Sequence, residues 1–65
     1  MSYQVPEFLT SGASDDWRDC AGSIECYIGD IENLTPSAVD DLKFNLNHIK
    51  KYVVAIDDFL RLNNL

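Results

Sequence analysis

The apolar side chains in the second half of the chain follow a heptad spacing over three repeats. They are Val39, Leu42, Leu46, Ile49, Val53, Ile56 and Leu60. This alternation of three and four places one apolar stripe along one side of an α-helix. No Gly or Pro interrupts residues 37–62, so the helix can be about 40 Å long at 1.5 Å per residue. A compact chain of this length would be only about 28 Å across, so we expect an elongated molecule.

Two helix starts can be read from the sequence. Thr35 precedes Pro36, which is typical of an N-cap followed by the first helical position. Ser14 precedes two aspartates, whose charges favour the positive end of a helix, and an apolar stripe with helical spacing follows it as far as Ile31. We therefore predict helices over about 14–32 and 35–62, although Gly29 offers the first helix an earlier end.

These elements predict an all-α fold with a single domain over residues 1–65. The connection between the helices is short enough to make them antiparallel neighbours, so we expect a helical hairpin. The second helix extends beyond the first. Its far half needs cover either from a short N-terminal segment packed on it or from another chain, which would complete a helical bundle by oligomerisation.

The long helix carries a second apolar face about 120° from the heptad stripe. The N-terminal segment, a second copy of the chain or a different protein could cover this face. Asp58 lies nearby without an oppositely charged neighbour at i+4, and is either a solvated carboxylate or a contact for a partner's cation. The predicted protein-binding residues are Phe44, His48, Tyr52, Ala55, Phe59, Leu62 and Asp58.

The chain has 11 acidic and 5 basic residues, which give a formal net charge of -6. A chain of this sign repels a polyanion, so we expect no direct contact with nucleic acid. The excess acids lie in residues 14–33. This segment is either a solvated face or a surface for a basic partner.

The sequence predicts a cytoplasmic protein without a membrane segment. The longest wholly apolar run covers residues 52–56, far short of a bilayer span, and no base precedes Arg18 as a signal peptide would require. Cys20 and Cys26 would lie on different faces of one helix, too far apart for a disulfide. Two free thiols are typical of a reducing compartment.

The residues offer little for catalysis or cofactor binding. His48 is the only histidine, and a pairing with Cys20 or Cys26 in space is compatible with the sequence, but a helical hairpin has no deep pocket to exclude water. One histidine and two cysteines six residues apart do not form the usual four-ligand zinc pattern. We therefore predict no enzyme activity, no cofactor and no metal site within one chain.

Three functional hypotheses remain. The first is a small acidic protein that binds another protein as an inhibitor or adaptor, of the kind that phages and mobile elements encode. The second is a homo-oligomeric subunit whose long helices assemble into a bundle. The third is a nucleic-acid mimic that blocks a DNA-binding protein, which would require the acids of the first helix to lie in a row.

Overall fold

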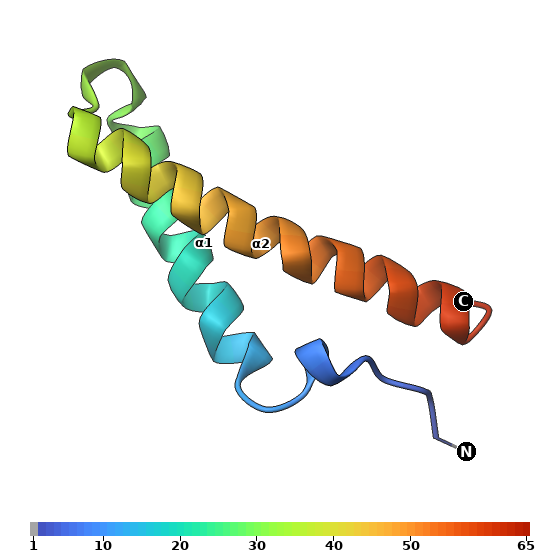
Figure 1. The fold of residues 1–65 in the computed structure, drawn as a ribbon. Coiled ribbons are helices and arrows are strands. Elements are labelled where there is room, and N and C mark those ends of the chain that lie inside the picture. Colours follow the sequence, from blue (N-terminus) through green and yellow to red (C-terminus); the bar gives the residue numbers. More distant parts are fainter. Residues whose placement is uncertain (1) are drawn as a thin grey trace.

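The computed structural model describes residues 2–65 and shows two α-helices that fold back on each other (Figure 1). A 3₁₀ turn at Glu7–Leu9 precedes helix α1, Ala13–Gly29, and a second 3₁₀ turn at Ile31–Asn33 leads to helix α2, Pro36–Leu62. No strand occurs within these described residues. The predicted all-α hairpin with an N-terminal segment packed on it is confirmed.

Helix α1 begins and ends differently from the sequence prediction. Its N-cap is Gly12, with φ 76° and no side-chain capping hydrogen bond, so Ser14 lies inside the first turn. Glycine adopts this left-handed conformation without the steric cost that a Cβ would add. At the other end the helix stops at Gly29 and not at residue 32, because residues 31–33 tighten into the separate 3₁₀ turn.

Helix α2 begins as the sequence predicts. The backbone N–H of Ala38 donates to the Thr35 hydroxyl oxygen over 3.1 Å, and Pro36 occupies the first turn. This hydrogen bond satisfies one of the amides left free at a helix start. The helix ends at Leu62. Two residues later, Asn64 has a positive φ of 56°.

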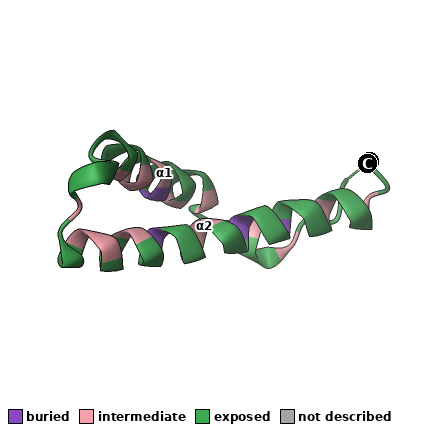
Figure 2. Cartoon of the chain, turned by 90° about the horizontal axis from the view of Figure 1, so that it is seen from above, coloured by how far each residue is buried: buried purple, intermediate pink, exposed green. Residues whose placement is uncertain are grey.

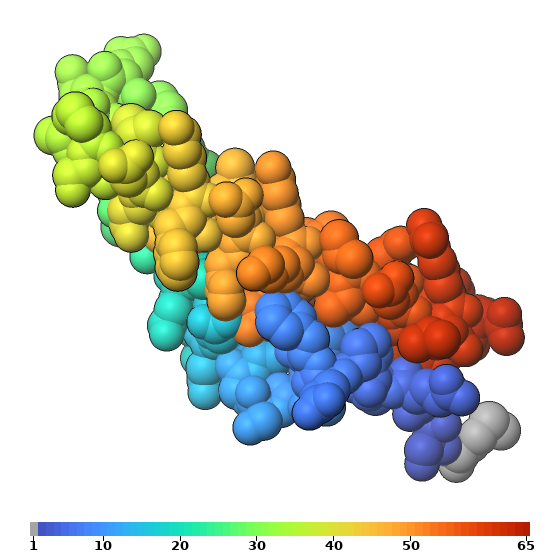
Figure 3. All heavy atoms as spheres, in the orientation of Figure 1, coloured from blue at the N-terminus to red at the C-terminus, as the bar shows by residue number. Residues whose placement is uncertain are grey.

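The molecule is elongated, with extents of 49 × 19 × 16 Å and a radius of gyration of 14.6 Å, against about 11 Å for a compact chain of this length. The helices diverge from the connecting loop, and the N-terminal segment runs back along the free half of α2 (Figures 1 and 3). Gln4 and Asn63 are joined by two hydrogen bonds of 2.8 Å. Tyr3 places its ring edge-on to Phe59 at 5.7 Å.

The core is small. Only Cys20, Asn45, Tyr52 and Ala55 are buried among the described residues (Figure 2). The Asn45 amide donates to the backbone carbonyl of Asp41 over 2.8 Å, which satisfies a polar group inside the helix pair. Two of the three buried residues of α2, Tyr52 and Ala55, belong to the second apolar face and not to the heptad stripe.

The heptad stripe of α2 is only partly covered. Val39, Leu42 and Ile49 are half-buried. The exposed fractions of the other four members are 42% for Leu46, 52% for Val53, 43% for Ile56 and 40% for Leu60. Helix α1 is ten residues shorter than α2, 17 against 27, and the buried side of α2 is centred away from the stripe.

Candidate functional site

Four side chains meet between the N-terminal half of α1 and the middle of α2, and we call them the polar cluster. Asp16 and Cys20 stand one turn apart on α1, and His48 and Tyr52 stand one turn apart on α2. The Tyr52 hydroxyl donates to Asp16 Oδ2, and the same oxygen pairs with Nε2 of His48. Because residues at i and i+4 share a helix face, each helix contributes two groups to one point.

Aromatic rings surround the polar cluster. The ring of Phe8 lies 4.6 Å from that of Tyr52, and the edge of Trp17 approaches Tyr52 at 6.3 Å. Phe44 stacks on His48 at 6.2 Å with an interplanar angle of 9°. The N-terminal segment and both helices thus enclose the polar groups with apolar surface, which strengthens their electrostatic interactions.

The cluster is buried on one side and open on the other. Cys20 and Tyr52 are buried, whereas the side chains of His48 and Asp16 are 30% and 42% exposed. The hydrogen bond from Tyr52, followed by that from His48, lowers the pKa of Asp16. The same bond to Asp16, with burial, raises the pKa of Tyr52 to about 12. Burial, followed by the charges of Asp16 and Asp19, raises the pKa of the Cys20 thiol.

The Cys20 thiol of this cluster is not activated as the nucleophile of a catalytic triad would be. A triad needs the histidine to take a proton from the nucleophile with one ring nitrogen while the carboxylate holds the other. Here Asp16 pairs with Nε2 of His48, and the raised pKa of Cys20 disfavours the reactive thiolate. The arrangement therefore gives no support to cysteine-based catalysis.

The same groups have the donor types of a metal site. Asp16, Cys20 and His48 offer one oxygen, one sulfur and one nitrogen atom, all within 4.8 Å of one another. The sequence interpretation allowed a pairing of His48 with either cysteine, and the structure brings Cys20 to it. It overlooked Asp16, although the i, i+4 spacing of Asp16 and Cys20 was visible in the sequence.

The predicted protein-binding residues divide into covered and exposed ones. Tyr52 and Ala55 are buried. His48 is half-buried in the polar cluster, and Phe59 is half-buried against Tyr3. The N-terminal segment therefore covers part of the second apolar face. The exposed ones are Phe44 (68%), Leu62 (55%) and Asp58.

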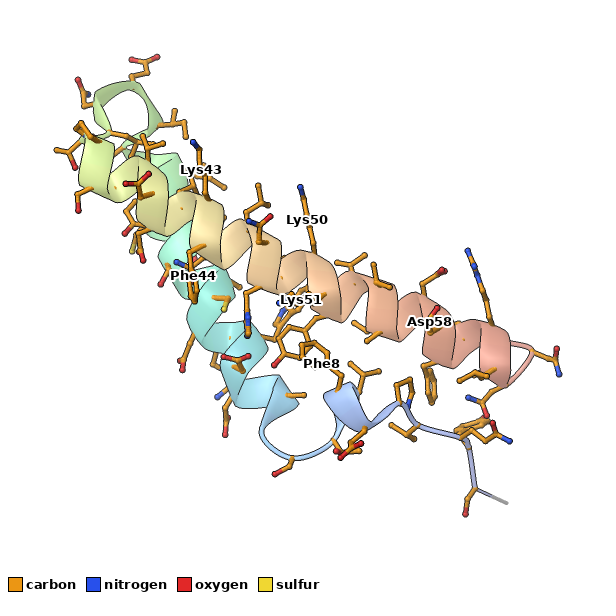
Figure 4. The ribbon with its side chains drawn as sticks, in the orientation of Figure 1. Phe8, Lys43, Phe44, Lys50, Lys51 and Asp58 are labelled. Atoms are coloured by element: carbon orange, nitrogen blue, oxygen red, sulfur yellow. The ribbon has the colours of Figure 1, made fainter. Side chains whose placement is uncertain are left out.

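A shallow groove of about 480 Å³ lies between Phe8 of the N-terminal segment and the surface of α2. Its walls combine Phe8, Val54 and Ala55 with the charged side chains of Lys51 and Asp58. In Figure 4, Lys43 and Lys50 point away from α1, whereas Phe8 lies below α2 near Lys51. Asp58 thus stands among apolar and basic groups of its own chain.

The four exposed members of the heptad stripe form an apolar surface separate from the second apolar face. We call this surface the open stripe: Leu46, Val53, Ile56 and Leu60. A groove of about 280 Å³ adjoins Ile56, with Trp17 and Leu9 among its lining residues. The sequence predicted the stripe itself, and only the packing shows which of its members face solvent.

Comparisons of the chain with protein-family models, with curated proteins and with solved structures find no match. Within residues 2–65, no helix combines the length and the apolar character that crossing a lipid bilayer requires.

Proposed function

We propose that this protein is a non-enzymatic binding module that docks the open stripe of α2 on an amphipathic helix of another protein. The observation that carries the proposal is the exposure of four heptad members, Leu46, Val53, Ile56 and Leu60, each at least 40% exposed, with the half-buried Ile49 between the first two. Heptad spacing is the pattern with which one helix packs into the grooves of another. Contiguous exposed apolar surface of this kind marks interaction sites.

The chemistry of the chain fits the role of an inhibitor or adaptor. The acids of residues 14–33 give the chain a negatively charged segment as well as an apolar surface, and charge of one sign favours a partner of the other sign. Two free thiols, at Cys20 and Cys26, fit a reducing, cytoplasmic setting. Small inhibitors of host proteins are of the kind that phages and mobile elements encode, and we extend the proposal to such an origin.

Self-assembly is the second candidate, and the same heptad spacing favours it. A second copy offers an identical stripe, and two stripes related by a twofold axis would form an isologous helix pair. The nucleic-acid mimic is less well supported. Asp15 pairs with Arg18 over 3.6 Å, whereas the next acid, Asp16, belongs to the polar cluster. These neighbouring acids of α1 therefore do not form one anionic row.

The test compares two adjacent valines. Val53 belongs to the open stripe, whereas Val54 is 60% exposed on a different side of α2. We expect Val53→Asp to abolish binding while Val54→Asp retains it, with the far-UV circular dichroism of both variants unchanged. A tagged pull-down identifies a partner, and sedimentation equilibrium of the purified chain measures self-association.

The outcomes separate the two candidates. A partner that is lost only with Val53→Asp supports the inhibitor or adaptor, whereas a concentration-dependent dimer that is lost only with Val53→Asp supports self-assembly. Equal binding by the wild type and both variants would reject the open stripe as the interface. Phe59 belongs to the predicted protein-binding residues, but Phe59→Asp would not test binding alone. The Phe59 ring packs against Tyr3, so its removal would also release the N-terminal segment.

A further inference from the structure

We propose that Asp16, Cys20 and His48 bind a divalent cation of the zinc class between the N-terminal half of α1 and the middle of α2. The ligand atoms would be one carboxylate oxygen, the Cys20 sulfur and one ring nitrogen of His48, which already lie within 4.8 Å of one another. Two residues on α1 and one on α2 supply them, so the ion would join the helices. This proposal is independent of the binding function proposed above.

The donor set selects the ion. Zinc binds thiolate sulfur at about 2.3 Å and imidazole nitrogen or carboxylate oxygen at about 2.0–2.2 Å. In a tetrahedral site those bonds place the donors about 3.3–3.8 Å from one another. The three donor atoms, all within 4.8 Å of one another, are within about 1 Å of this spacing. Magnesium and calcium prefer oxygen ligands alone and would leave the sulfur and nitrogen unused.

Tyr52 would orient the carboxylate ligand. Its hydroxyl donates to Asp16 Oδ2, and metal-binding carboxylates are commonly held by such hydrogen bonds from groups that do not touch the ion. The rings of Phe8 and Trp17 pack against Tyr52 at 4.6 and 6.3 Å and hold it in place. The contact between His48 and Asp16 would be exchanged for two bonds to the ion.

Charge and exposure also fit a bound cation. A thiolate at Cys20 and a carboxylate at Asp16 carry two negative charges, which one divalent ion balances. Asp19, whose charge acts on Cys20, adds to the negative potential. The exposed sides of Asp16 and His48 leave a fourth position to water, as in zinc sites with three protein ligands.

The two cysteines provide a matched pair of variants. The reduced, chelator-treated protein is titrated with Zn²⁺ by calorimetry and with Co²⁺ by absorption spectroscopy. We expect one ion per chain and a thiolate-to-cobalt charge-transfer band. Cys20→Ser removes the band and weakens Zn²⁺ binding at least tenfold. Cys26→Ser, which removes the exposed cysteine outside the cluster, retains both.

Two further measurements keep the proposal testable if Cys20→Ser fails to fold. In the Cys26→Ser protein, Zn²⁺ slows alkylation of the remaining thiol, Cys20. Tyr52→Phe keeps one ion per chain but weakens its binding about tenfold. Three results would overturn the site: no binding, binding without the charge-transfer band, which indicates surface carboxylates, or alkylation of Cys20 that Zn²⁺ does not slow.

Discussion

Removal of the Phe8 ring tests whether the N-terminal segment is part of the folded core. Phe8 is 44% exposed, and its ring lies 4.6 Å from that of Tyr52. A phenylalanine can bury roughly 150–250 Å², so a little over half of this, about 85–140 Å², is removed from water. At about 25 cal/mol per Å², Phe8→Ala should lower the free energy of unfolding by about 2–3.5 kcal/mol.

This loss is large for so short a chain. At roughly 0.05–0.15 kcal/mol per residue, the whole protein has a free energy of unfolding of about 3–10 kcal/mol. Urea unfolding can be followed by far-UV circular dichroism and by the fluorescence of Trp17, the only tryptophan. With a slope of about 1 kcal/mol per molar urea, the midpoint should fall by about 2–3.5 M.

Phe44→Ala is the matched control, because Phe44 is also aromatic but is 68% exposed. The same arithmetic assigns it less buried area, and the higher helix propensity of alanine offsets part of its loss. We expect a decrease of about 1 kcal/mol. If Phe8→Ala costs no more than Phe44→Ala, the N-terminal segment does not stabilise the helices and the described packing is wrong.

Three further predictions concern local structure. Gly22→Ala should raise the free energy of unfolding by about 1 kcal/mol, because a Cβ there meets no atom within 4 Å, whereas Gly12→Ala, at φ 76°, should lower it by about 1 kcal/mol in the same urea titration. Thr35→Ala should cost about 1 kcal/mol through loss of the α2 cap, and an unchanged midpoint would contradict that role. The hydrogen bond to Asp41 raises the pKa of Tyr27, so its stabilisation is complete below about pH 10 and is lost as the pH rises through the folded-state pKa. Thermal unfolding should therefore show a smaller alkaline loss of stability for Tyr27→Phe than for the wild type.

The helices themselves could be predicted because their signals are local. The Thr35 cap and Pro36 act within one turn, and the apolar spacing of α2 depends only on helical geometry. The start of α1 was less predictable. The left-handed Gly12 ended the preceding turn, and Ser14, a residue type that favours caps, became part of the helix.

The sequence by itself determined an elongated all-α hairpin, because heptad spacing, helix caps and a short connection need no knowledge of distant contacts. Only the tertiary structure decided which apolar face is covered. The N-terminal segment occupies the face around Tyr52 and Phe59, and the open stripe remains exposed. It also decided that Asp16, Cys20 and His48 meet. The packing of α1 on α2 brings together side chains up to 36 positions apart, and periodicity within each helix contains no information about which of them meet.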